Sequence, residues 1–365
     1  MAEIEVVPTT DAATLARFDA VIDARSPGEF ALDHLPGALN LPVLSDAERA
    51  EVGTIYVQDS RFNARRIGAA YVARNVAAHL QTALADRPGS FRPLVYCWRG
   101  GMRSNAMATI LAQVGWRTAV VRGGYQAYRR EVTARLYDSE PKLRVVLIDG
   151  HTGSGKTEIL ARLAERGVQT LDLEGLAAHR GSLFGHIPGR PQPTQKLFES
   201  RLLSAIDRLD PARPVAVEAE SSKVGERMVP PVLWKAMAEA PRIELSAPPG
   251  ARARYLAAAY GDVVDDREAL RAAFERLPTY PGRQRLADWR RMVDEGAWEA
   301  LALALMEQHY DPAYRRSSRK HARPTLRRIE LADLSPGAIA RAADEVAALV
   351  GTFALDTGAN TTSAS

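Results

Sequence analysis

The only cysteine of this 365-residue chain lies in a loop that could hold a reactive thiolate. Cys97 directly follows the apolar stretch 93–96, and Arg99, two glycines and Arg103 come immediately after it. The glycines let the backbone curl into a cradle, while the arginines and the N-terminus of a following helix favour an anion. A thiolate held in this way can attack a sulfur or selenium donor and carry the atom as a persulfide or selenosulfide. The alternative is that Cys97 is a small buried residue with a packing role. The position of Cys97 and its basic neighbours favour the reactive role.

A second loop, about fifty residues later, fits the phosphate-binding pattern G-x-x-x-x-G-K-[ST]. It follows the continuous apolar stretch 143–149 and opens a helical pattern, which is the structural context that this motif requires. Its backbone N–H groups are expected to wrap a phosphate, the lysine to bridge phosphate oxygens, and the threonine could ligate magnesium. The predicted phosphate-binding residues are Gly150, Gly153, Ser154, Gly155, Lys156 and Thr157.

Polar residues among glycines in the stretch 171–185 predict a substrate loop near the phosphate site. Two glutamates follow the predicted strand 214–217, where acids can hold a metal or its water shell. The alternatives are a plain strand-to-loop transition and capping or surface acids, and no dedicated metal-ligand set is predicted. The candidate residues here are Asp172, Glu174, His179, Arg180, Ser182, Glu218 and Glu220.

Basic residues gather in two places near the C-terminal end, as expected of a protein that binds a polyanion such as RNA. One group is interleaved with Tyr280 and Trp289, and the other lies beside Tyr310 and Tyr314. The alternative is a solvated helix face balanced by acids. The candidate RNA-binding residues are Arg283, Arg290, Arg315, Arg316, Arg319 and Lys320.

The bulk composition is that of a globular protein with more than one domain. Hydrophobic residues make up 46% and charged residues 25% of the chain, with a formal net charge of +4. No apolar run approaches the roughly 20 residues that a membrane span needs, and the N-terminus lacks the pattern of a signal peptide. A single cysteine excludes an intramolecular disulfide. These features favour a cytoplasmic location.

Strands alternating with helices predict α/β domains with parallel sheets. We expect an α/β domain over residues 1–138, with Cys97 at the end of one strand, and a P-loop NTPase-like α/β domain over 139–250. A helical, arginine-rich part is predicted over 251–350. The tail, 351–365, lacks apolar anchors and is predicted to be disordered.

The first part of the chain resembles a rhodanese domain. Residues 23–30 and 33–42 match two signatures of that family, 97–104 resemble its active-site loop, and 123–125 its closing motif. The resemblance covers residues 10–135 and implies a rhodanese-like fold with a chalcogen-transfer cysteine, Cys97, whose anion pocket is shaped by Arg99 and Arg103. For Asp23, Arg25 and His34 we favour a role in pinning loops.

Taken as a whole, the sequence resembles the tRNA 2-selenouridine synthase family, in which a rhodanese domain is fused to a P-loop domain. The distinctive stretches are 97–104, 150–157, 172–176, 179–182, 217–221 and 309–314. The resemblance implies a transferase that acts on wobble 2-thiouridine of tRNA in two steps: S-geranylation with geranyl diphosphate, then selenation with selenophosphate, with Cys97 carrying the selenium.

The same resemblance implies no required cofactor, although magnesium could bind, and no membrane partner. Basic clusters would hold the tRNA, and an anticodon base would have to leave its stack to enter the site. The alternative function comes from another class: a rhodanese-like docking or sensing module fused to an ATP-dependent kinase. The intact Cys97 with its arginines argues against a docking module.

Overall fold

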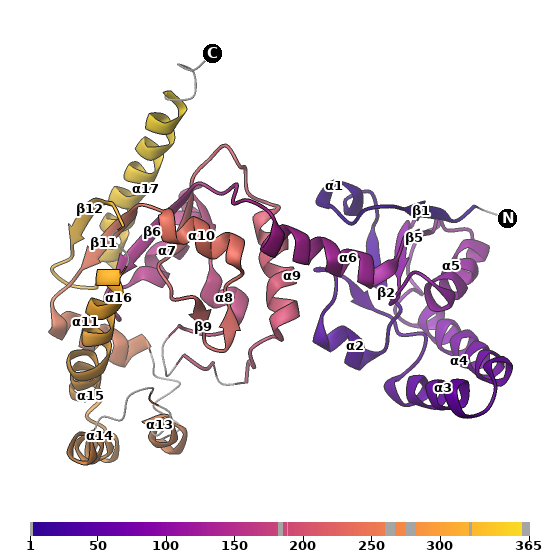
Figure 1. Ribbon diagram of the computed structural model, residues 1–365, viewed down its shortest axis with the longest axis horizontal. Coiled ribbons are helices and arrows are strands. Elements are labelled where there is room, and N and C mark those ends of the chain that lie inside the picture. The colour runs from indigo at the N-terminus through magenta and orange to yellow at the C-terminus, as the bar shows by residue number, and fades with distance from the viewer. Residues whose placement is uncertain are drawn as a thin grey trace. The chain divides into compact units, whose positions relative to one another are not determined.

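The computed structural model describes residues 3–181, 185–187, 189–259, 267–274, 277, 282–320 and 323–359. Within these ranges, the side chains of 269, 272, 273, 317–320 and 354–359 are not described. The chain forms two compact units. Met1–Asp138 with Thr194–Asp207 make the first unit, and Ser139–Pro193 with Arg208–Ser365 make the second. Figure 1 shows the elements of each unit.

The first unit is built on a five-stranded sheet whose strands all run parallel. Its spatial order is β1 (Glu5–Val7), β5 (Ala119–Val121), β4 (Pro93–Tyr96), β2 (Ala20–Asp23) and β3 (Leu39–Asn40). The helical elements are α1 (Ala12–Leu15), α2 (Pro27–Leu32), α3 (Asp46–Gln58), α4 (Arg61–Gln81), α5 (Met102–Val114), α6 (Gly124–Thr133), the π-helical turn η1 (Ala134–Asp138) and α9 (Gln195–Ile206).

The core of this unit lies between β4 and the helices that cover it. Every residue of β4 is buried, and apolar positions of α4 and α5, among them Val76 and Met107, pack onto it. The N-terminus of α3 is fixed by Ser45 and Glu48, which cap each other's backbone N–H groups. This packing holds the C-terminal end of β4, where Cys97 begins the loop to α5, in one position.

The second unit also contains a five-stranded parallel sheet. Its order is β12 (Thr325–Glu330), β11 (Arg242–Ser246), β6 (Val145–Gly150), β8 (Val215–Glu218) and β7 (Gln169–Leu171), and β9 (Lys223–Val224) and β10 (Arg227–Met228) form an antiparallel hairpin. The helical elements are α7 (Lys156–Glu165), α8 (Leu173–Ala177), α10 (Pro231–Glu239), α11 (Pro249–Ala259), α13 (Arg267–Phe274), α14 (Arg283–Glu295), α15 (Trp298–Leu305), the π-helical turn η2 (Met306–Tyr310), α16 (Asp311–Lys320) and α17 (Pro336–Ala359).

Strand β6 lies at the centre of this sheet and is buried along its whole length. The chain leaves β6 toward β7 on one side and leaves β8 toward β11 on the other, so the carboxyl ends of β6 and β8 form the type of crevice in which open parallel sheets bind ligands. Gly150 and Glu218 are the last residues of these two strands. The phosphate loop and the acidic residues therefore share one edge of the sheet.

The expected domain boundaries are wrong at three points. Strand β12 belongs to the sheet of the second unit, so 251–350 is not a separate helical part; its sequence hides this because only Ile329 of the strand is buried. Helix α17 continues to Ala359, and Phe353 packs against the core of the second unit, so the tail that the sequence predicts to be disordered from residue 351 begins as helix. Residues 360–365 lie outside the described residues.

Helix α9 lies within the range predicted for the P-loop domain but belongs to the first unit. Its buried Glu199 is paired with Arg129 and accepts a hydrogen bond from the Tyr137 hydroxyl at 2.6 Å. A carboxylate placed in the interior needs such partners, and these lie over 60 residues away in sequence. Among the helices described, none has the length and apolar character to cross a membrane.

Candidate functional site

Cys97 lies at the C-terminal end of β4 and opens the loop that leads to α5, as predicted. Its side chain is 3% exposed, and Sγ lies 3.1 Å from the Ser104 hydroxyl of α5. The loop is held from the other side by the closing motif: the backbone N–H of Tyr125 donates to the Cys97 carbonyl at 2.8 Å. A Cβ on Gly124 would lie 2.2 Å from that carbonyl oxygen, so this position requires glycine.

The two arginines of the loop are engaged away from the sulfur. Arg103 forms an ion pair with Glu29 of α2 at 2.7 Å, and although burial opposes it, this pair lowers the pKa of Glu29. Arg99 is exposed and donates to the Gln126 side chain at 3.1 Å. An incoming anion would therefore compete with Glu29 for Arg103. The sequence did not predict this ion pair because Glu29 and Arg103 are far apart in the chain.

Arg25 and Asp23 have the structural role that we favoured for them. The guanidinium of Arg25 is 1% exposed, binds both carboxylate oxygens of Asp23, donates to the Asp33 carbonyl at 2.6 Å and lies 4.0 Å from the centre of the Tyr125 ring. His34 stacks on Phe30. These contacts brace the loop that faces the closing motif of the rhodanese-like unit.

The phosphate loop connects β6 to α7 with the backbone that its glycines predict. Gly150, Gly153 and Gly155 all have positive φ angles, and a Cβ on Gly150 would lie 2.6 Å from the Leu245 carbonyl oxygen. Lys156 Nζ donates to the Gly150 carbonyl at 3.1 Å. The Ser154 hydroxyl is buried and finds no hydrogen-bond partner among the described residues. These features suit a loop that wraps an anion.

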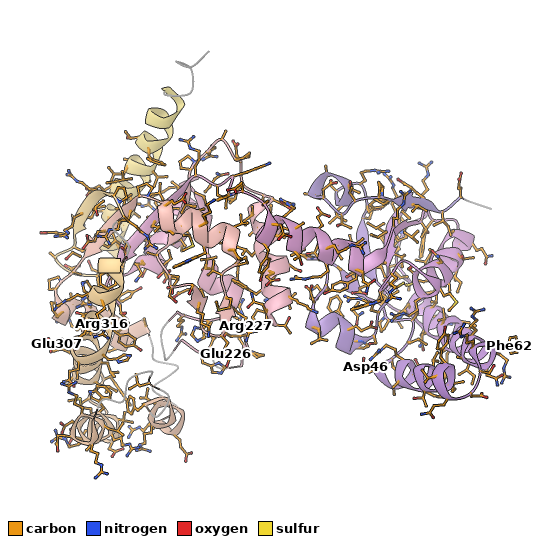
Figure 2. The ribbon with its side chains drawn as sticks, viewed as in Figure 1. Asp46, Phe62, Glu226, Arg227, Glu307 and Arg316 are labelled. Atoms are coloured by element: carbon orange, nitrogen blue, oxygen red, sulfur yellow. The ribbon has the colours of Figure 1, made fainter. Side chains whose placement is uncertain are left out.

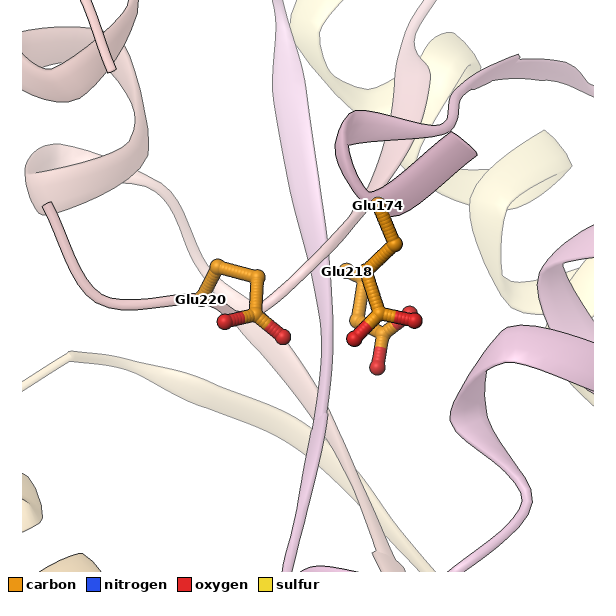
Figure 3. A group of neighbouring side chains, drawn as sticks. All are labelled: Glu174, Glu218 and Glu220. Atoms are coloured by element: carbon orange, nitrogen blue, oxygen red, sulfur yellow. The ribbon is translucent and has the colours of Figure 1, made fainter. Parts of the chain in front are cut away.

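Three glutamates from different elements converge beside this loop. Glu174 of α8, Glu218 of β8 and Glu220 place carboxyl oxygens within 4.8 Å of one another, and Figure 3 shows the three side chains converging. Thr157 donates its hydroxyl to Glu174 or Glu218, at 3.2 and 3.0 Å, and Lys156 Nζ lies 3.8 Å from Glu218. The sequence named all three acids but did not predict that they meet.

Burial and mutual repulsion raise the pKa values of these carboxyl groups. Burial, followed by the charge of Glu218, raises the pKa of Glu174 to about 9 and that of Glu220 to about 7. Burial also raises the pKa of Glu218, although Lys156 opposes the shift. Three hard carboxylate ligands and the Thr157 hydroxyl form a donor set that fits Mg²⁺. A bound divalent cation would replace the protons that the cluster otherwise retains.

The remaining residues of the predicted substrate loop have separate positions. Asp172 is the N-cap of α8 and accepts the Gly175 N–H at 2.8 Å. Gly181 approaches the carboxyl cluster so closely that a Cβ there would lie 2.4 Å from Glu174. Arg180 lines the P-loop cavity, and burial lowers the pKa of His179 in the neighbouring cavity. Ser182 lies outside the described residues.

A network that the sequence did not predict ties the phosphate loop to α16. Asp311, the first residue of that helix, accepts two hydrogen bonds from Arg252 at 3.0 and 2.7 Å and contacts His151 Nδ1 at 3.0 Å. Burial alone would raise the pKa of Asp311, but hydrogen bonds from His151 and Arg252 hold that pKa well below its ordinary range. Arg252 also donates to the Thr152 carbonyl at 3.0 Å.

The predicted RNA-binding arginines lie on two helices of the second unit. Arg283 and Arg290 are exposed on α14, and Arg315 and Arg316 are exposed on α16; Figure 2 labels Arg316. Trp289 is 1% exposed within a helical core, so it cannot stack on RNA from that position. Tyr280 and the side chains of Arg319 and Lys320 lie outside the described residues.

Comparison with known proteins defines the class of both units. A model of the rhodanese-like domain matches residues 10–131, and a model described as the tRNA 2-selenouridine synthase AAA domain matches residues 143–277. The fold agrees, with a parallel sheet in each unit and a phosphate loop after β6 in the second. The protein is therefore a rhodanese domain joined to a P-loop domain.

Proteins named tRNA 2-selenouridine synthase resemble the chain over most of its length. That of Shewanella denitrificans is 31% identical over 85% of this chain and 83% of its own. The relative from Sulfurovum sp. is 31% identical over 80% and 87%, and that from Chromohalobacter salexigens is 33% identical over 81% and 87%. The chain belongs to the tRNA 2-selenouridine synthase family.

Proposed function

We propose that this protein is a transferase that converts the wobble 2-thiouridine of tRNA into 2-selenouridine in two steps. In the first step the thiocarbonyl sulfur attacks the C1 carbon of geranyl diphosphate, and diphosphate leaves. In the second step the selenium of selenophosphate attacks the same base carbon and expels geranylthiolate, and hydrolysis of the selenium–phosphorus bond then releases phosphate and leaves 2-selenouridine. Geranylation precedes selenation because alkylation converts a poor leaving group into a good one.

The observation that carries the proposal is the P-loop cavity of about 520 Å³. Its lining combines the phosphate loop and Lys156 with the apolar residues Ala161, Leu256 and Ala259. A prenyl diphosphate has the same two parts, an anionic head and a hydrocarbon chain. Loop N–H groups and Lys156 would stabilise the negative charge that grows on the departing diphosphate.

A divalent cation fits beside this head group. Glu174, Glu218 and Glu220 would hold Mg²⁺ together with Thr157. Such an ion would supply neutralisation of diphosphate charge. No hydrolysis of a nucleotide is required, so the P-loop would serve as a binding site for a substrate diphosphate.

Lys156→Ala tests the first step. Removing a charge-assisted contact worth roughly 1.5–3 kcal/mol should weaken geranyl diphosphate binding about ten- to a hundredfold. Geranylation of 2-thiouridine tRNA should fall accordingly, while selenation of tRNA that is already geranylated should fall much less. Loss of ATP hydrolysis alone, with geranylation intact, would instead favour a kinase.

Cys97→Ser tests the second step. Cys97 is proposed to carry the selenium, because it lies at a strand end before the N-terminus of α5. The variant should form geranylated tRNA at nearly the normal rate and no 2-selenouridine, as measured by mass spectrometry of tRNA nucleosides. Normal selenation by the serine variant would remove Cys97 from the mechanism.

A further inference from the structure

A larger cavity adjoins the P-loop cavity within the second unit and has no role in the function proposed above. Its volume is about 1250 Å³. The β9–β10 hairpin, α10, β11, η2 and α16 contribute to its walls. The two cavities have six lining residues in common, Thr152, Gly181, Ala219, Glu220, Tyr310 and Tyr314. A ligand in the larger cavity would therefore lie beside whatever the phosphate loop holds.

The walls of the larger cavity contain several aromatic rings. Trp234 comes from α10, and Tyr310 and Tyr314 come from η2 and α16. Tyr314 is held in place because its hydroxyl donates to Asp149 at 3.0 Å and its ring lies 4.3 Å from that of His151. Such rings can stack on any nucleic-acid base, because every base has a π face.

Cationic side chains line the same cavity. Arg242 is neutralised by Asp149 at 2.8 Å. On the hairpin, Arg227 pairs with Glu226, and Figure 2 labels these two residues. Within the described part of the chain, Lys223 and Arg323 are the lining cations that no carboxylate pairs with, and Arg323 Nε is buried without a hydrogen-bond partner. Burial lowers the pKa of Arg323, and the charge of Asp149, which lines the same cavity, opposes this shift only in part. An anionic ligand would relieve this desolvation.

Size and the charged lining residues favour an occupant other than the prenyl chain. The smaller cavity already offers apolar walls next to the phosphate loop. The larger one exceeds the roughly 300–1,000 Å³ of ordinary small-ligand pockets, and it combines rings with unpaired cations. A base with its flanking phosphates needs these features, because rings hold the base and cations hold the backbone.

We propose that the larger cavity receives the target nucleoside of single-stranded RNA, with its base against Trp234 and its flanking phosphates at Lys223 and Arg323. This placement rests on the proposed function, since it brings the base to the shared wall beside the diphosphate. In this placement the larger cavity recognises the target nucleoside. The exposed arginines of α14 and α16 would then contact phosphates farther along the RNA.

The test uses the full-length protein and two stem–loop RNAs. One carries 2-thiouridine at the wobble position of its loop, and the other carries an abasic nucleotide there. The variants are Trp234→Leu and the double change Lys223→Gln with Arg323→Gln. Lys235→Gln is the matched control, because Lys235 follows Trp234 on α10 but pairs with Glu140 outside the cavity. RNA affinity is measured by fluorescence anisotropy and geranyl diphosphate affinity by calorimetry.

Trp234→Leu should weaken binding of the thiouridine RNA about tenfold and leave the abasic RNA unchanged, because it removes one base stack. The double variant should weaken both RNAs and reduce the slope of log affinity against log salt by about 1.4. Both variants should bind geranyl diphosphate like wild type, which also shows that the second unit is folded. Lys235→Gln should behave as wild type throughout.

Unchanged preference for the thiouridine RNA in Trp234→Leu, with intact geranyl diphosphate binding, would overturn the placement. Loss of geranyl diphosphate affinity instead would assign the cavity to the prenyl chain, and displacement of the RNA by ATP would assign it to a mononucleotide. If wild type itself does not distinguish the two RNAs, the proposed function fails. If a variant does not fold, the thiouridine RNA is photo-crosslinked to the wild-type protein instead. Crosslinks to residues of the larger cavity would support the proposal, and crosslinks confined to α14 would contradict it.

Discussion

Glu174 shows at the scale of one residue how burial makes this site sensitive to pH and to cations. Its pKa is raised to about 9 by burial and by Glu218, against an ordinary value of 4.5. Between these values the folded protein keeps a proton that the unfolded chain has lost. The free energy of unfolding must therefore fall as the pH rises through this window.

Glu174→Gln should remove much of this pH dependence. In wild type without Mg²⁺, the free energy of unfolding should decrease between pH 6 and 9 by about 1.4 kcal/mol per pH unit for each proton retained. The glutamine variant should show a flatter dependence and should be the more stable protein at pH 9. Chemical denaturation in EDTA measures this, with the exposed Glu165→Gln as the control.

Magnesium should act in the opposite direction on the same residue. Because the ion binds the deprotonated carboxylates, it should raise the melting temperature of wild type more at pH 8.5 than at pH 6. The glutamine variant should respond more weakly. An equal response of both proteins at both pH values would show that the carboxylate cluster does not bind the ion.

At the scale of elements, the junction of η2 and α16 positions the phosphate loop. The side chains of Asp311 and Arg252 form an ion pair and are only 8% and 4% exposed. Arg252 also donates a hydrogen bond to the Thr152 carbonyl of the phosphate loop. A π-helical turn precedes Asp311, and such turns are frequent at functional sites. We interpret this junction as a brace that keeps the loop in its anion-binding form.

Asp311→Asn should loosen this brace, because it leaves the buried Arg252 charge without its partner. We expect a loss of about 3–5 kcal/mol in the free energy of unfolding at pH 7 and weaker geranyl diphosphate binding. Since the pKa of Asp311 is held low, this contribution is present above the ordinary value of 3.8 and is lost as the pH falls below it. Urea denaturation at several pH values would measure it.

The control for this change is Asp344→Asn. Asp344 also pairs with an arginine, Arg166 at 2.7 Å, but its side chain is 67% exposed. An exposed pair contributes roughly 0–1 kcal/mol. A similar loss in both variants would mean that Asp311 has no special role in bracing the loop.

At the scale of the whole molecule, the basic helices should set the salt dependence of tRNA binding. Each neutralised phosphate contributes roughly 0.7–0.9 to the slope of log affinity against log salt. Replacing Arg315, Arg316, Arg319 and Lys320 by alanine should flatten the slope by about three units if all four contact phosphates. Geranyl diphosphate affinity without tRNA should not change.

An unaltered salt slope would place the RNA surface elsewhere, with Arg283 and Arg290 of α14 as the next candidates. A slope that changes only with Lys223 and Arg323 would confine the contacts to the larger cavity. Filter binding of full-length tRNA across a range of salt concentrations separates these outcomes.

The sequence by itself determined the two α/β units and the position of each reactive loop. Cys97 and Gly150 come directly after short apolar stretches, and such stretches form buried parallel strands. Loops at strand ends then carry the chemistry. These features are local in sequence, so residue type and spacing suffice to predict them.

Only the tertiary structure decided which distant residues meet. Glu174 and Glu218 are 44 positions apart and come together because β8 pairs with the edge strand β7, which α8 directly follows. Asp311 contacts His151, which lies 160 positions away in sequence. Glu29 pairs with Arg103 of the cysteine loop, 74 positions away. Edge strand β12 escaped prediction because its exposed residues lack an apolar pattern. Contacts of this kind depend on sheet order and helix packing, which no local pattern specifies.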